Sequence, residues 1–109
     1  MNKLEKVIKE IEELSKLENK QIPEMFIKFN EEFGEFAAEV IKMIGCSHKP
    51  YDEEHLKEEM ADALQCLLCL YLKISREKNF DIKEVFEQVL IKNKKWKAKI
   101  AEYTHNLKI

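Results

Sequence analysis

The scarcity of helix-breaking residues is the feature that most limits how this chain can fold. Its 109 residues include only two Gly and two Pro. An all-β domain must punctuate every strand with a turn, and turns use these residues heavily. The hydrophobic fraction of 45% is high enough to bury a core, which disfavours a disordered chain. We therefore expect one all-α domain over residues 1–109, because a chain of this length holds hardly more than one domain.

Apolar residues recur at three- and four-residue spacing and predict four helices. The expected helices cover roughly Asn2–Asn19, Pro23 to about Ile44, Asp52 (as the N-cap) to about Lys78, and a stretch that opens at Asp81. Pro23 suits a first helical turn, and Gly45 suits a C-terminal stop. Asp81 and Glu84 have the spacing of a capping box. The expected protomer resembles a four-helix bundle of long antiparallel helices.

Charge and hydropathy exclude several classes of protein. The chain has 19 Lys and Arg against 21 Asp and Glu, a net charge of −2, which argues against a nucleic-acid partner. The longest apolar stretch, Met60–Leu72, is too short and too interrupted to cross a bilayer, so we expect no membrane partner. Met1 is followed by charged residues rather than an apolar signal core. The expected location is the cytoplasm.

The three cysteines do not form an even-numbered disulfide framework. Cys66 and Cys69 have the spacing of a zinc-binding pair, but they lie inside an apolar helical segment. Structural zinc sites usually take such pairs from turns. We therefore expect Cys66 and Cys69 to be buried free thiols.

The expected third helix carries carboxylates where its surroundings are apolar. Nearly the whole circumference of its segment 60–74 is apolar, so we expect this helix to be buried on most sides. At about 100° per residue, one stripe of the helix contains His55, Glu58, Glu59, Asp62, Gln65, Cys66 and Cys69. Glu59 and Asp62 are neighbours at three-residue spacing. Because an unpaired buried acidic pair is costly, a positive charge should stand opposite.

The expected second helix offers a matching set of carboxylates. Its core stripe contains several phenylalanines, and Glu32, Glu35 and Glu39 line one flank of that stripe. Two helices that each present carboxylates at i and i+3 can converge them on a shared divalent ion. Mg²⁺ prefers oxygen ligands and keeps several waters, which suits a phosphate substrate. Mn²⁺ is the alternative ion.

Three segments resemble the MazG-like nucleotide pyrophosphohydrolases. They are KFNEEFGEF (Lys28–Phe36), EEMADALQCLL (Glu58–Leu68) and the basic KNKKWK (Lys92–Lys97). The resemblance implies an oligomeric all-α enzyme that uses Mg²⁺ to cleave nucleoside triphosphates to monophosphate and pyrophosphate, with a nucleotide-pool housecleaning role. It also implies that the catalytic, metal-binding residues are Glu32, Glu35, Glu59 and Asp62. One of them, or Glu31 or Glu58, would orient the attacking water.

The expected fourth helix offers groups for the substrate. Asn93 and Lys97 share a face with apolar residues and should point inward, so Lys97 could bind a phosphate and Asn93 a phosphate or sugar oxygen. Lys94 is a reserve for the same role. The apolar face of this helix, which includes Trp96, extends beyond what one small bundle can cover. We therefore expect a homodimer or a homotetramer.

Two other functions remain open. Phosphoribosyl-ATP pyrophosphohydrolases share the paired acidic motifs. A non-catalytic helical dimerisation protein would also explain the surplus apolar surface, although it has no reason to bury Asp62 opposite other carboxylates.

Overall fold

The computed structural model describes residues 1–107, and these form four helices. Their bounds are α1 Lys3–Leu17, α2 Ile22–Met43, α3 Glu53–Lys78 and α4 Ile82–Leu107. No strand occurs within this range, so the all-α prediction is confirmed. None of the helices in the same range is both long and apolar enough to cross a membrane.

Local signals set the helix ends close to where the sequence predicts them. The Asp52 side chain accepts a hydrogen bond from the backbone N–H of Glu54 at 3.0 Å, as an N-cap does. At the end of α2, Gly45 has a φ of 80°, a conformation that glycine adopts without strain. At the end of α3, Asn79 adopts the left-handed conformation with a φ of 58°.

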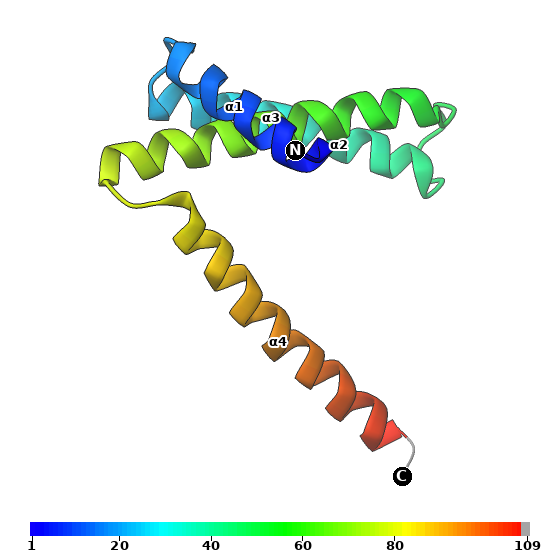
Figure 1. The fold of residues 1–109 in the computed structure, drawn as a ribbon. Coiled ribbons are helices and arrows are strands. Elements are labelled where there is room, and N and C mark those ends of the chain that lie inside the picture. Colours follow the sequence, from blue (N-terminus) through cyan, green and yellow to red (C-terminus); the bar gives the residue numbers. More distant parts are fainter. Residues whose placement is uncertain (108–109) are drawn as a thin grey trace.

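Helices α2 and α3 form a long antiparallel pair, and α1 packs against α3 (Figure 1). The core joins these three helices through five buried residues, Ile11, Met25, Cys69, Leu70 and Leu72. Two side chains of α3 hold the end of α1 through three hydrogen bonds. The Arg76 guanidinium donates to the Ser15 hydroxyl at 2.7 Å and to the Ser15 carbonyl at 2.8 Å. The Lys73 ammonium donates to the Glu18 carbonyl at 2.8 Å.

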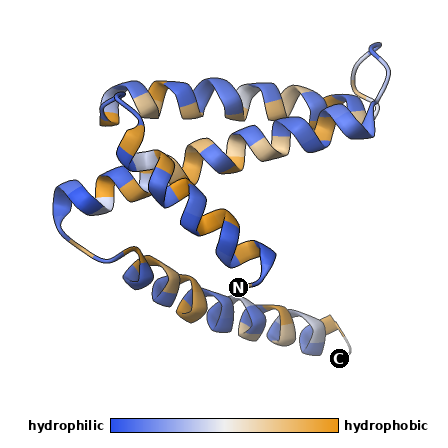
Figure 2. Cartoon of the chain, turned by 45° about the horizontal axis from the view of Figure 1, so that its top comes forward, coloured by the Kyte–Doolittle hydropathy of each residue, from blue (hydrophilic) through white to orange (hydrophobic). Residues whose placement is uncertain are grey.

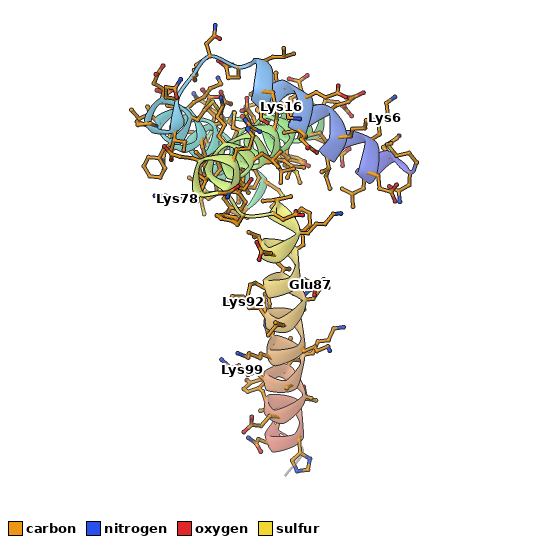
Figure 3. The ribbon with its side chains drawn as sticks, turned by 60° about the vertical axis from the view of Figure 1, so that its left-hand side comes forward. Lys6, Lys16, Lys78, Glu87, Lys92 and Lys99 are labelled. Atoms are coloured by element: carbon orange, nitrogen blue, oxygen red, sulfur yellow. The ribbon has the colours of Figure 1, made fainter. Side chains whose placement is uncertain are left out.

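Helix α4 does not complete a bundle within the chain. It leaves the end of α3 and extends away from the three-helix body, touching α3 alone among the other helices (Figure 1). None of its described residues is buried. Its apolar residues form a stripe along the helix (Figure 2), and side chains such as Glu87, Lys92 and Lys99 project freely around it (Figure 3).

The expectation that α3 is buried on most sides is wrong for this chain. Met60 is 51% exposed, Leu64 is 48% exposed and Tyr71 is 39% exposed. These side chains remain uncovered because α1 and α2 occupy only part of the circumference of α3, and α4 turns away from it.

Candidate metal centre

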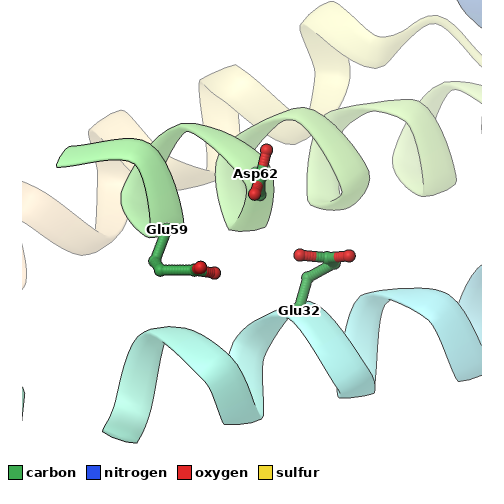
Figure 4. A group of neighbouring side chains, drawn as sticks. All are labelled: Glu32, Glu59 and Asp62. Atoms are coloured by element: carbon green, nitrogen blue, oxygen red, sulfur yellow. The ribbon is translucent and has the colours of Figure 1, made fainter. Parts of the chain in front are cut away.

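Three carboxylates from α2 and α3 converge on one point. Glu32 of α2 faces Glu59 and Asp62 of α3 across the antiparallel pair (Figure 4). One oxygen from each residue lies within 4.8 Å of the others. The three-residue spacing of Glu59 and Asp62 places both on the side of α3 that faces α2.

Two of these carboxylates have a buried oxygen without a partner. The Oε2 atoms of Glu32 and Glu59 are inaccessible to solvent, and neither accepts a hydrogen bond. The Oε1 atoms are placed differently. Glu32 Oε1 lies 3.5 Å from Lys28 Nζ, and Glu59 Oε1 lies 3.2 Å from His55 Nε2. Each carboxylate therefore faces a basic side chain through one oxygen and leaves the other free.

This arrangement fits a divalent cation. A buried charged oxygen without a partner is costly, and the repulsion among three nearby carboxylates adds to that cost. A hard cation such as Mg²⁺ takes carboxylate oxygens as ligands and keeps bound waters. Asp62 is exposed, so the group opens to solvent on that side. Glu32, Glu59 and Asp62 are the residues that could hold such an ion.

The surroundings keep Lys28 charged and the nearby thiol neutral. The Cys66 sulfur, when ionised, and the Glu32 carboxylate raise the pKa of Lys28. Burial raises the pKa of the Cys66 thiol, so the thiol stays protonated at neutral pH. Cys66 and Cys69 are both buried and free, as the sequence predicts.

Glu35 lies outside this group. Its side chain is exposed, whereas Glu32, one turn earlier on α2, faces α3. Of the four carboxylates predicted as ligands, the structure brings together Glu32, Glu59 and Asp62. The buried carboxylate further along α2 is Glu39, which is 3% exposed.

The three substrate-binding candidates on α4 are remote from the core of the chain. Asn93, Lys94 and Lys97 are all exposed. The expectation that Asn93 and Lys97 point inward is wrong for a single chain, because the turn after α3 directs α4 away from the body. The apolar face of α4 that these residues border is uncovered in the single chain.

A groove between α1 and α3 opens beside the carboxylate group. It has a volume of about 530 Å³. Its apolar lining residues are Val7, Ile11, Leu14, Ala61 and Leu64. Asp62 and Gln65 also line it, so one candidate metal ligand borders both the groove and the carboxylate group.

Sequence spacing did not single out the basic partners of these carboxylates. Lys28 precedes Glu32 by four residues, and His55 precedes Glu59 by four residues. Side chains at this spacing are neighbours on a helix, so the pairs carry a readable signal. The four-residue spacing alone does not distinguish these two pairs from the many Lys–Glu pairs at the same spacing elsewhere in the chain.

A family model matches most of this chain. The family model of the MazG nucleotide pyrophosphohydrolase domain matches residues 3–100, which include all of α1, α2 and α3 and most of α4. No curated protein and no solved structure matches the chain. Members of the matched family are hydrolases of phosphoric anhydrides and generally depend on a metal ion. Since the family model covers nearly the whole chain, the chain belongs to the MazG nucleotide pyrophosphohydrolase family.

Proposed function

We propose that this protein is a Mg²⁺-dependent nucleoside triphosphate pyrophosphohydrolase that converts ribo- or deoxynucleoside triphosphates to monophosphates and pyrophosphate. The observation that carries the proposal is the pair of buried, unpartnered oxygens on Glu32 and Glu59, with the Asp62 carboxylate beside them. The proposed setting is housecleaning of the nucleotide pool in the cytoplasm.

The metal would be held by Glu32, Glu59 and Asp62, with Glu35 as a further proposed ligand or water-orienting carboxylate. When bound, Mg²⁺ supplies charge neutralisation to the phosphates and lowers the pKa of a water. Lys28 faces one oxygen of the ligand carboxylate Glu32, so it orients that side chain. In the reaction, water attacks the α-phosphorus, the bond to the bridging oxygen breaks, and pyrophosphate leaves.

The groove between α1 and α3 is the proposed site for the nucleoside. It borders Asp62, so a triphosphate at the carboxylate group would place its base or sugar nearby. Apolar side chains such as Ile11 and Leu64 can pack against a base, and the Gln65 amide can donate and accept hydrogen bonds.

Self-association is the second part of the proposal. The stripe on α4 exposes Trp96 at 68%, Tyr103 at 65% and Ile100 at 54%, which is unusual for a helix that faces only water. A homodimer or homotetramer in which α4 packs against a second copy would cover this stripe. It could also bring Asn93, Lys94 and Lys97 to the acidic group of that copy, which the positive charges of the two lysines complement.

The reaction is tested by identifying its products. The purified protein is incubated with Mg²⁺ and a panel of ribo- and deoxynucleoside triphosphates plus phosphoribosyl-ATP, and the products are separated by chromatography. We expect pyrophosphate and the monophosphate. Release of orthophosphate and a diphosphate would refute attack at the α-phosphorus, and cleavage of phosphoribosyl-ATP alone would assign the alternative function.

Carboxylate variants then test the site. We expect Glu32→Gln and Asp62→Asn each to lower turnover by about a hundredfold or more, as losses at metal centres do. Glu35→Gln decides whether the exposed carboxylate takes part. Glu87→Gln on α4 is the matched control and should turn over like the wild type. Full activity in Glu32→Gln or Asp62→Asn would remove that residue from the site.

The assembly is tested by light scattering at micromolar concentration. We expect a dimer or tetramer, and Trp96→Glu should dissociate it because a charge would then enter the apolar contact. A wild-type protein that is monomeric at this concentration would contradict the proposed self-association.

A further inference from the structure

Glu39 is a buried carboxylate that lies outside the candidate metal centre. Its side chain is 3% exposed. Glu39 Oε1 lies 2.7 Å from Lys42 Nζ and 2.8 Å from His55 Nδ1. Its Oε2 atom is buried and has no hydrogen-bond partner. A buried carboxylate is costly to maintain, so its contacts with Lys42 and His55 must compensate that cost.

His55 connects this buried carboxylate to the metal centre. It lies in the first turn of α3, where its backbone N–H donates to the Asp52 cap at 3.4 Å. Its Nδ1 atom faces Glu39 of α2, and its Nε2 atom lies 3.2 Å from Glu59 Oε1 of α3. The imidazole thus bridges carboxylates on two different helices, and both of its ring nitrogens are engaged.

The bridge limits the orientations that the Glu59 carboxylate can adopt. A glutamate side chain has three rotatable bonds, so its free carboxylate samples many orientations. Contact with His55 Nε2 holds Oε1, while Oε2 stays buried and without a hydrogen-bond partner. The ring also contacts Glu39, a buried side chain of α2.

We propose that His55 is a positioning residue of the metal centre, that it fixes the Glu59 carboxylate for metal binding, and that the buried Glu39 anion holds its ring in place. The inference rests on the metal-dependent function proposed above. The inference assigns a function to Glu39, a residue that lies outside the group of proposed metal ligands. Partners that orient metal ligands commonly contribute 10- to 100-fold to metal affinity.

A purely structural ion pair would behave differently. The His55 side chain is 44% exposed but its partner Glu39 is only 3% exposed, so loss of a ring with a structural role would lower the stability of the metal-free protein. Removal of a ring that only pairs with Glu39 would leave metal affinity unchanged. Removal of a ring that positions Glu59 would weaken it. The two roles therefore predict different metal affinities.

The test measures Mn²⁺ affinity by the electron paramagnetic resonance signal of free Mn²⁺. We expect His55→Ala and Glu39→Gln each to weaken binding by about 10- to 100-fold. His55→Gln should retain part of the affinity, because its amide can still donate to Glu59. The double variant of His55→Ala and Glu39→Gln should bind like His55→Ala alone, since Glu39 acts through the ring. His105→Ala, at an exposed position far along α4, is the matched control.

Melting curves without metal separate positioning from folding. Because Lys42 still pairs with Glu39 Oε1 in His55→Ala, the metal-free melting temperature should change little while metal affinity falls. If Glu39→Gln does not fold, the two His55 variants decide the question. Unchanged or tighter Mn²⁺ binding in His55→Ala would overturn the inference.

Glu32→Gln distinguishes failure of the inference from failure of the proposed function. If Glu32→Gln abolishes Mn²⁺ binding and His55→Ala does not affect it, the metal centre stands and the positioning role falls. If the wild-type protein itself does not bind Mn²⁺, both fall.

Discussion

Replacement of Glu32 by Gln should stabilise the metal-free protein and remove its response to Mg²⁺. The prediction follows from two features of the site. Glu32 and Glu59 have side chains that are only 16% and 13% exposed, and their nearest ligand oxygens lie within 4.8 Å of each other. Their negative charges therefore repel with little screening, and a cation relieves the repulsion.

The magnitude follows from this separation. Two unit charges 4.8 Å apart repel by about 1 kcal/mol in water and about 3.5 kcal/mol at an effective dielectric constant of 20. Glu32→Gln also removes the ion pair with Lys28, which is worth about 0–1 kcal/mol. The net gain in the free energy of unfolding should be about 1–2 kcal/mol, and each kcal/mol raises the melting temperature of a domain near this size by about 4 °C or more.

Mg²⁺ binding should reverse the order of the melting temperatures of the wild type and Glu32→Gln. Mg²⁺ at a hundred times its dissociation constant would add about 2.7 kcal/mol to the stability of the wild type. The wild type should therefore melt below Glu32→Gln without Mg²⁺ and above it with saturating Mg²⁺.

The assay is a set of circular dichroism melting curves with and without millimolar Mg²⁺. NaCl at matched ionic strength controls for screening, which also relieves repulsion. Glu87→Gln controls for loss of a carboxylate elsewhere and should respond to Mg²⁺ like the wild type. If Mg²⁺ stabilises the wild type no more than NaCl does, or stabilises Glu32→Gln equally, the reasoning about this site is refuted.

Three further predictions concern packing and the buried thiols. Arg76→Ala should lower the free energy of unfolding by about 1–3 kcal/mol, because it removes two charge-assisted hydrogen bonds to Ser15. Urea denaturation measures this change, and an unchanged midpoint would contradict the prediction. Burial raises the pKa of the Cys66 and Cys69 thiols, so iodoacetamide at neutral pH should alkylate the exposed Cys46 first and the other two only on unfolding, as mass spectrometry would show. For the same reason the free energy of unfolding should fall as pH rises past 9.0, the ordinary pKa of the thiols, since the unfolded chain releases these protons first.

The helices and their ends were predictable because local interactions determine them. The Asp52 cap forms with backbone groups only two and three residues away, and the positive φ of Gly45 is a property of that residue type. The acidic pair Glu59 and Asp62 was also readable, because a helix places residues three apart on one face.

Which carboxylate of α2 joins that pair was decided by the tertiary structure. Glu32 and Glu35 lie about 60° apart around the helix, so helical spacing alone makes both eligible. The rotation of α2 against α3 brings Glu32 to the pair and leaves Glu35 exposed. This rotation results from the packing of the core, to which many residues contribute at once.

Two other features also required the tertiary structure. Glu39 and His55 are 16 positions apart and on different helices, so no helical period relates them, and only the antiparallel pairing of α2 and α3 brings their atoms to 2.8 Å. The direction of α4 depends on the turn that follows α3 at Asn79. The sequence by itself determined the helices and the acidic character of their facing sides, because these follow from local spacing. The tertiary structure decided which side chains meet, because that depends on how whole helices are rotated and inclined against each other.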